Sequence, residues 1–209
     1  MIRSIRPSSV SWRLKPRATT SGALELLAPR PGDDVLEIGF CHGRTIARLA
    51  TVVSDGLIAG VEISERMLRM ACRLNRRLIE QGHVELKLAD GIAIPYEEEQ
   101  FDRALTVHTL YFWPSPADSL REIRRVMKPG GRVVLGFRSA DDSSIFRDFP
   151  RSAYRFYRSG EVVRLLEGAG FYEVRAREPR WGSALGRVRG CRARPRMTGG
   201  PSRLAPPRW

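Results

Sequence analysis

From Asp33 onward, short apolar runs alternate with longer segments in which apolar residues recur every three or four positions. A short apolar run predicts a buried strand, and the longer spacing predicts an amphipathic helix. The predicted strands cover residues 34–38, 57–61, 84–88, 101–107, 132–137 and 171–176. The predicted helices cover residues 44–53, 65–81, 115–127 and 160–168. Strands that alternate with helices in this way predict an α/β protein with a doubly wound, mostly parallel sheet.

Local signals mark the ends of two of these helices. Ser64 suits the N-cap of helix 65–81, and Gly82 suits its C-terminal cap. Pro116 suits the first turn of helix 115–127. The arginines of helix 65–81 lie off its apolar face, so we expect them to face solvent rather than a ligand.

The net charge of +13 is confined to the two ends of the chain. Residues 1–22 hold five basic and no acidic side chains, and residues 180–209 hold eight basic and no acidic ones. We therefore predict one neutral domain over residues 23–179, with disordered basic tails on either side. A neutral body offers no track for phosphates, which disfavours a nucleic-acid partner.

Composition disfavours several other classes of protein. No apolar run approaches the roughly 18 residues of a membrane span, so none is expected. The three cysteines and three histidines are widely spaced, which predicts neither a disulfide framework nor a bound metal. Free cysteines favour a reducing compartment, and we expect a cytoplasmic protein.

A glycine turn after the first strand is the strongest chemical signal, in the segment VLEIGFCHG at residues 35–43. A dinucleotide fingerprint would need glycine at two positions that hold Cys41 and Arg44. The carboxylate of Glu37 inside the segment would repel a pyrophosphate, and it suits a cationic ligand. Glu62 ends the second strand, where an acid accepts hydrogen bonds from ribose hydroxyls. These positions predict a pocket for a ribose that is linked to a cation.

Four ordered motifs extend this signal over about residues 23–178: VLEIGFCHG, GVEIS, LADGIAIPYEEEQFDRALTVHTLYFWP and LREIRRVMKPGGRVVLGF. With these motifs the sequence resembles the class I S-adenosylmethionine-dependent methyltransferases. Within that class it resembles the small-molecule, type 11 group, which includes ubiquinone/menaquinone-like enzymes. The resemblance implies a Rossmann-like sheet of six to seven strands. The segment from Trp181 onward lacks an apolar strand pattern, so we do not expect it to supply the seventh, antiparallel strand.

The resemblance also implies roles for individual residues. The positions that match the cofactor-binding residues of the family are Glu37, Gly39, Cys41, Gly43, Glu62, Ile63, Met67, Asp90, Gly91 and His108. Cys41 stands where the family has a glycine, and its Cβ is expected to crowd the ligand. His108 is the candidate general base, and is needed only if the acceptor is a hydroxyl.

The implied activity is transfer of a methyl group from S-adenosylmethionine to a small-molecule acceptor by direct in-line displacement. The aromatic residues Tyr111, Phe112 and Trp113 either line an acceptor pocket or pack the loop. Two alternatives stay open: an S-adenosylmethionine-binding protein without catalysis, and a nucleic-acid methyltransferase that uses the basic tails. The DNA amino-methylating motif ends in a Pro-Pro pair that residues 108–111 lack. An NAD-dependent oxidoreductase is a third alternative, and the sequence supports it least.

Overall fold

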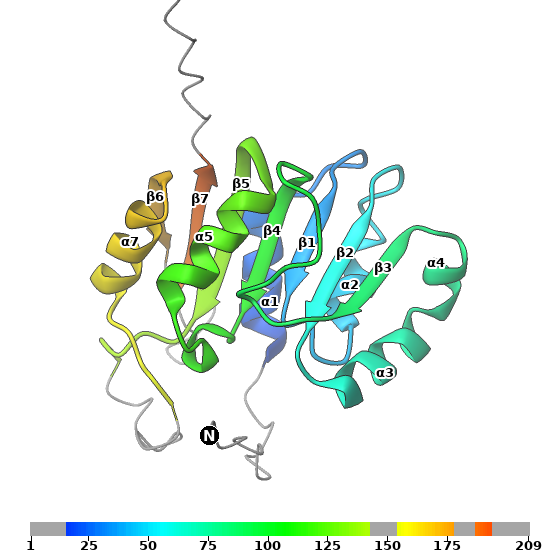
Figure 1. Ribbon diagram of the computed structural model, residues 1–209, viewed down its shortest axis with the longest axis horizontal. Coiled ribbons are helices and arrows are strands. Elements are labelled where there is room, and N and C mark those ends of the chain that lie inside the picture. Colours follow the sequence, from blue (N-terminus) through cyan, green and yellow to red (C-terminus); the bar gives the residue numbers. More distant parts are fainter. Residues whose placement is uncertain (1–15, 143–153, 178–186, 194–209) are drawn as a thin grey trace, which may run out of the picture.

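Seven strands form one sheet in the order β3-β2-β1-β4-β5-β7-β6 (Figure 1). The computed structural model describes residues 16–142, 154–177 and 187–193 of the chain. The strands are β1 Val35–Ile38, β2 Ile58–Glu62, β3 Val84–Leu88, β4 Phe101–Val107, β5 Met127–Phe137, β6 Phe171–Arg177 and β7 Arg187–Ala193. Strands β1 to β5 are mutually parallel, and β7 runs antiparallel to both β5 and β6. The predicted α/β class is confirmed.

Helices cover both faces of the sheet, with α5 and α7 in front and α1 and α2 behind in Figure 1. The helices are α1 Pro16–Leu27, α2 Arg44–Leu49, α3 Glu65–Leu74, α4 Arg76–Glu80, α5 Pro116–Val126 and α7 Ser159–Gly168, with a short 3₁₀ turn η1 at Leu110–Phe112. Successive residues of a strand face opposite sides, so Leu36 packs in the core under α5 and α7 while Val35 packs in the core under α1 and α2. Within the described residues, no helix is both long and apolar enough to cross a membrane.

The seventh strand corrects the sequence prediction. Residues 187–193 lie in the segment predicted to be a disordered tail, yet they pair with β5 from Arg132↔Arg192 to Phe137↔Arg187. Backbone pairing with strands on both sides does not require an apolar pattern in the strand itself, which is why the pattern missed it. The rest of that predicted tail lies outside the described residues.

The N-terminal boundary is corrected in the same way. Helix α1 begins at Pro16, inside the segment predicted to be disordered, and buries Ala23 and Leu27 completely. Arg103 of β4 fixes the end of this helix, because its guanidinium donates to the carbonyl oxygen of Leu27 at 2.8 Å. The domain therefore starts at least seven residues earlier than residue 23.

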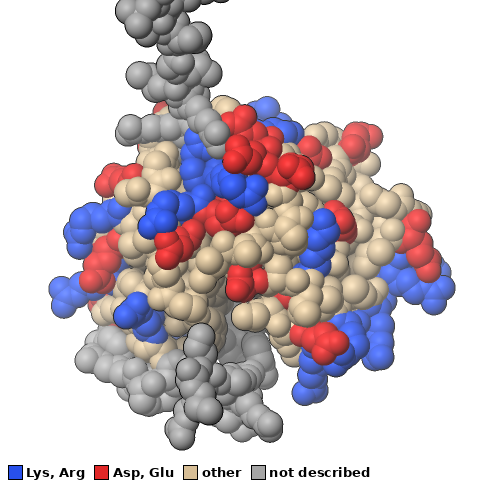
Figure 2. Space-filling view, viewed as in Figure 1, with Lys and Arg blue, Asp and Glu red and all other residues tan. Residues whose placement is uncertain are grey.

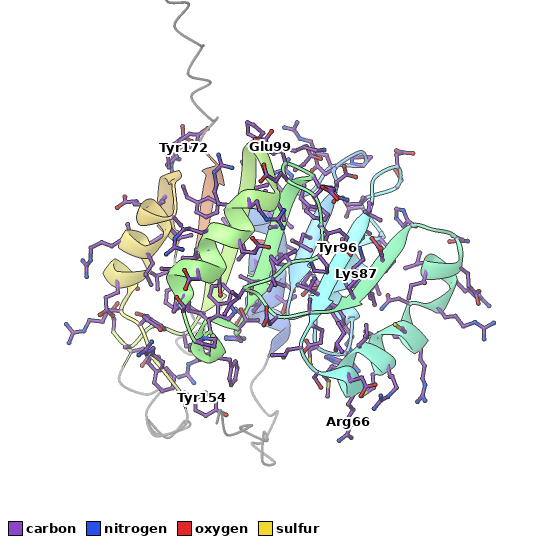
Figure 3. The ribbon with its side chains drawn as sticks, viewed as in Figure 1. Arg66, Lys87, Tyr96, Glu99, Tyr154 and Tyr172 are labelled. Carbon is purple, nitrogen blue, oxygen red and sulfur yellow. The ribbon has the colours of Figure 1, made fainter. Side chains whose placement is uncertain are left out.

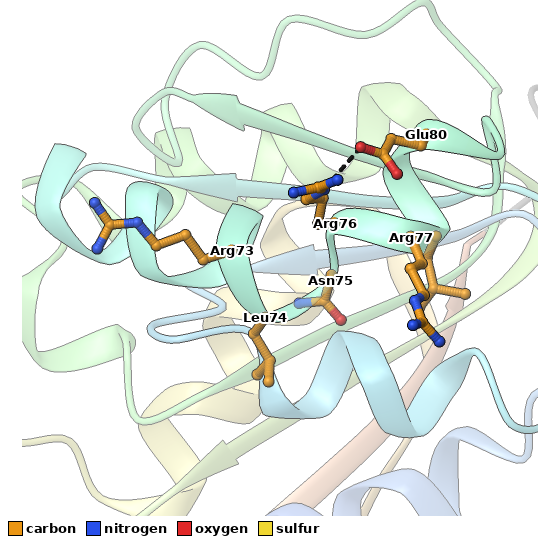
Figure 4. A pocket seen from close by; sticks show the side chains of 7 residues that line it. Arg73, Leu74, Asn75, Arg76, Arg77 and Glu80 are labelled. Atoms are coloured by element: carbon orange, nitrogen blue, oxygen red, sulfur yellow. Dashed lines mark hydrogen bonds and ion pairs between the residues drawn. The ribbon is translucent and has the colours of Figure 1, made fainter.

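The single helix predicted at 65–81 is divided at Asn75 into α3 and α4 (Figure 4). The buried Asn75 side chain donates from Nδ2 to the carbonyl oxygens of Ala71 at 2.9 Å and Gly43 at 3.1 Å. These bonds connect the turn after β1 to α3, and Asn75 itself departs from helical geometry, with φ −103° and ψ 17°. Ser64 is the N-cap of α3 as predicted, since its Oγ accepts from the Met67 amide.

The arginines of α3 and α4 are exposed, as the sequence predicts. In Figure 4, Arg73, Arg76 and Arg77 point away from one another, and Arg76 pairs with Glu80 at 2.8 Å. Figure 2 shows basic side chains gathered over α3 and α4 and acidic and basic side chains interspersed elsewhere. Arginines that diverge in this way form a solvated surface rather than a converging anion site.

Candidate active site

A cavity of about 340 Å³ opens where the parallel strands end. The sheet order places β2 on one side of β1 and β4 on the other, with their crossover helices on opposite faces. This is the switch point at which α/β sheets bind ligands, because the two connections diverge and leave a crevice. Seven of the predicted site residues line the cavity: Gly39, Cys41, Glu62, Ile63, Asp90, Gly91 and His108.

The Glu62 carboxylate is held at the end of β2 by two backbone amides. Its Oε2 accepts from the Cys41 N–H at 2.9 Å, and its Oε1 accepts from the Ser64 N–H at 3.0 Å. The side chain is 8% exposed. Each oxygen keeps acceptor capacity, so the group is preorganised to accept hydrogen bonds from a pair of vicinal hydroxyls.

The turn after β1 brings its backbone to the cavity through left-handed conformations at Gly39, Cys41 and Gly43. A side chain at Gly39 would overlap Thr109, so a glycine is required there. Gly43 has a different role, because a Cβ at this position would lie 2.7 Å from the Cβ of Ala71 on α3. Gly43 thus allows close packing of the turn on α3 and does not line the cavity.

Cys41, which stands where the resemblance implies a glycine, has a positive φ of +54°. A non-glycine residue in this region is strained. Glycine relieves that strain, but it loses more conformational entropy on folding, which offsets part of the gain. For Cys41→Gly we expect the free energy of unfolding to rise by up to about 1 kcal/mol. We also expect binding of S-adenosylmethionine to tighten several-fold, as measured by thermal denaturation and calorimetric titration. Cys41→Ala keeps the Cβ and should give neither gain; equal gains in both variants would contradict the argument.

Glu37 and Met67 lie behind the cavity wall rather than in it. Met67 supports the turn, with its Sδ 3.7 Å from the Sγ of Cys41. Glu37 is 3% exposed on the α2 side of β1, and its Oε2 has no hydrogen-bond partner among the described residues. Burial, and secondarily the charge of Glu62, raises the pKa of Glu37 to about 8, although a hydrogen bond from Thr45 opposes the shift. Glu37 is therefore protonated at neutral pH.

The far end of the cavity is shaped by the turn after β3. Asp90 is exposed, and its Oδ1 accepts from the amides of Ile92 at 3.0 Å and Ala93 at 2.9 Å. A Cβ on Gly91 would lie 3.6 Å from the indole Nε1 of Trp113 and 3.7 Å from Ser119 Oγ. The Ser119 hydroxyl is buried and has no partner among the described residues. These polar atoms suit the nitrogen-bearing edge of a heterocycle.

Sequence reasoning missed Ser119, although a signal was present. Ser119 is a polar residue on the inward face of α5, where Leu120, Ile123 and Val126 are buried. A buried hydroxyl at such a position normally has a partner. A polar residue on an otherwise apolar helix face could therefore have marked the site.

His108 and a group of aromatic rings form the opposite side of the cavity. His108 has a φ of +60°, and its Nδ1 lies 3.3 Å from the Tyr111 hydroxyl. Phe112 lines the cavity, and its ring lies 5.4 Å from that of Tyr154, at the edge where the parallel strands end (Figure 3). Burial and, to a smaller extent, the Arg138 charge lower the pKa of His108 to about 4, so the imidazole is neutral near pH 7.

A glycine turn after β1, an acid at the end of β2 and a cavity at the switch point are the features that the sequence analysis expects of a Rossmann-like S-adenosylmethionine-dependent methyltransferase. Residues 36–135 match a family model that is described as a methyltransferase domain. Residues 36–135 of the chain are therefore similar to this family. The match agrees with the predicted family, and solved structures that superpose on the chain have the predicted fold.

Three proteins are similar to this chain in sequence or in fold. An uncharacterized 37.1 kDa protein in transposon Tn4556 of Streptomyces fradiae is 34% identical over 78% of this chain and 49% of its own length. The 27-O-demethylrifamycin SV methyltransferase of Amycolatopsis mediterranei is 32% identical over 53% of this chain and 40% of its own. The crystal structure of the [4+2]-cyclase SpnF superposes with a TM-score of 0.70 at 20% identity, over 84% of this chain and 79% of that one. The chain thus spans half or less of the length of these two curated relatives.

Proposed function

We propose that this domain binds S-adenosylmethionine in the cavity at the switch point and methylates a small-molecule acceptor. The observation that carries the proposal is the Glu62 carboxylate, held at the cavity by the Cys41 and Ser64 amides. An acid fixed in this way is suited to a ribose diol. The 27-O-demethylrifamycin SV methyltransferase, a relative that is 32% identical, acts on a small molecule and supports the acceptor class.

Different residues of the cavity would contact different parts of S-adenosylmethionine. Glu62 would hold the ribose, while Gly91, Trp113 and the unpartnered hydroxyl of Ser119 would contact the adenine. Asp90 would contact the adenine amino group from the exposed turn. The backbone of Gly39 and Cys41 would hold the methionine portion, which leaves the methyl group toward His108 and Phe112.

When bound, the cofactor supplies an electrophilic methyl carbon: the acceptor forms a bond to it as the carbon–sulfur bond breaks, and the electron pair stays on sulfur. Such a step needs alignment and exclusion of water more than it needs a protein nucleophile. The apolar side chains of Ile38, Ile63 and Phe112 around the cavity would exclude water from the reacting atoms.

The test is a calorimetric titration with S-adenosylmethionine, followed by incubation with the methyl-labelled cofactor and a panel of phenols, enols, amines, thiols and oligonucleotides. We expect saturable binding and label in at least one small molecule. No binding heat at any concentration would refute the proposal. Binding with no transfer to any acceptor would favour a non-catalytic or non-methylating domain, a role that the cyclase SpnF shows to be compatible with this fold. Transfer to oligonucleotides alone would favour the nucleic-acid alternative.

A further inference from the structure

The Tyr111 hydroxyl lies between a fixed donor and a histidine nitrogen. The backbone N–H of Arg138 donates to Tyr111 Oη, and Oη lies 3.3 Å from His108 Nδ1. A backbone amide can only donate, so Oη must act as an acceptor toward Arg138. Burial raises the pKa of Tyr111 above its ordinary value, so the phenol keeps its proton at neutral pH. Among the described residues, the acceptor left for that proton is His108 Nδ1.

We propose that the Tyr111 hydroxyl donates a hydrogen bond to His108 Nδ1 and so fixes His108 as the neutral tautomer that carries its proton on Nε2. Nε2 has no partner among the described residues, and His108 lines the cavity. His108 would then present an N–H donor to the acceptor rather than a base. Tyr111 is a positioning residue in this arrangement, because it acts through His108. The assignment of the tautomer stands by itself, whereas the role toward an acceptor rests on the proposed function.

The charges around His108 favour this role over proton abstraction. The groups that face it are the Tyr111 phenol and the Arg138 guanidinium, and Arg138 lies 3.6 Å from a carboxylate oxygen of Asp142. A buried imidazole beside a guanidinium resists becoming an imidazolium, which is what a general base must become. The Nε2–H group of this tautomer can stabilise a negatively charged oxygen in the cavity.

These features define the chemical class of the acceptor. Phe112 lines the cavity and its ring lies 5.4 Å from that of Tyr154, while the rings of Tyr111 and Phe156 lie 5.6 Å apart. Such rings suit a planar, apolar acceptor. We infer an ionised phenol or enol, which loses its proton to solvent and is methylated on that oxygen or on the conjugated carbon. The proton leaves before the methyl carbon is attacked, so the step needs no protein base.

Nuclear magnetic resonance of the full chain labelled with nitrogen-15 histidine tests the tautomer without any ligand. The chain has three histidines, and His83 is an internal reference because its Nε2 lies 2.8 Å from the Val53 carbonyl oxygen and so must carry the proton. We expect His108 to show the same Nε2–H tautomer and to remain neutral down to about pH 5, given its lowered pKa. A proton on Nδ1 of His108 in the wild type would overturn the proposal.

Two tyrosine variants separate positioning from general packing. Tyr111→Phe should give His108 a mixture of tautomers and raise its pKa, because Nδ1 becomes free to accept a proton. Tyr157→Phe is the matched control, since the buried Tyr157 hydroxyl has no partner among the described residues. It should leave the His108 signals unchanged. An unchanged tautomer in Tyr111→Phe would also overturn the proposal.

Activity toward two phenols tests the role of the donor. With 4-nitrophenol and the less acidic unsubstituted phenol, the alkaline rise in rate should follow each acceptor's own pKa rather than one shared value. His108→Ala should lower kcat by about 100-fold, the effect of losing one donor to an oxyanion. His108→Gln, which donates but cannot act as a base, should recover most of that loss. A shared pKa, or a Gln variant as slow as the Ala variant, would refute the donor role. Absence of cofactor binding would instead refute the proposed function and leave the tautomer result unaffected.

Discussion

Glu62→Ala is expected to lower the affinity of the domain for S-adenosylmethionine by at least about 100-fold, or about 3 kcal/mol. The variant removes two charge-assisted hydrogen bonds to the ribose, each of which contributes about 1.5–3 kcal/mol. It also removes the acceptor for the Cys41 and Ser64 amides, so the turn that carries the methionine site loses its anchor. Calorimetric titration measures the affinity, and a thermal melt checks that the variant is folded.

Two further variants make this result specific. Glu62→Gln keeps the shape and one acceptor oxygen, so its affinity should lie between those of the wild type and the Ala variant. Glu80→Ala removes the same charge from an exposed ion pair with Arg76, far along α4 from the cavity, and should bind as the wild type does. If folded Glu62→Ala bound the cofactor as tightly as the wild type, the ribose assignment would be wrong.

Glu37→Gln is expected to stabilise the folded chain at alkaline pH by roughly 3–5 kcal/mol. The folded-state pKa of Glu37 is raised from 4.5 to about 8, so between these values the folded chain holds a proton that the unfolded chain has lost. The stability associated with protonated Glu37 is therefore fully present below pH 4.5 and is lost as pH rises toward 8. Glutamine resembles the protonated acid and does not titrate, so the variant should keep its stability across this window.

The clearest range for the measurement is pH 6.5 to 8. His108 and His42 have lowered pKa values, and their unfavourable effect on stability appears only as pH falls below 6.5. Across the range the wild type should lose about 1.4 kcal/mol per pH unit in urea denaturation, and Glu37→Gln should not. Glu25→Gln, on the exposed face of α1, is the control and should follow the wild type. A wild-type curve that is flat from pH 6.5 to 8 would contradict the raised pKa.

Glu37 also shows where sequence reasoning about the site reached its limit. The motif predicted a carboxylate in β1 that suits a cationic ligand, but Glu37 does not line the cavity and its protonation state could not be derived from the motif. That state depends on burial against α2 and on the nearby Glu62. Because Glu62 lies on another strand, the coupling exists only once β1 and β2 have paired.

Several corrections share this physical origin. Local hydrophobic periodicity did not predict helix α1 or strand β7, because each is stabilised by partners distant in sequence. Arg103 bonds to Leu27 of α1, and β5 pairs with residues 187–193. The break in the helix at Asn75 follows from its hydrogen bond to Gly43, which lies 32 residues away. The positions of the first six strands along the chain and the glycine turn needed no such partners, because each follows from local periodicity and local backbone preference.

The sequence by itself determined the fold class, the family and the edge of the sheet that carries the site. Hydrophobic periodicity, a glycine turn and an acid at a strand end are local properties of the chain, so they can be recognised without knowing any tertiary contact. Only the tertiary structure decided the protonation of Glu37, the grouping of Trp113 and Ser119 around Gly91, and the direction of the proton between Tyr111 and His108. Those properties depend on burial and on hydrogen bonds between separate elements, which exist only after the sheet and its helices have packed together.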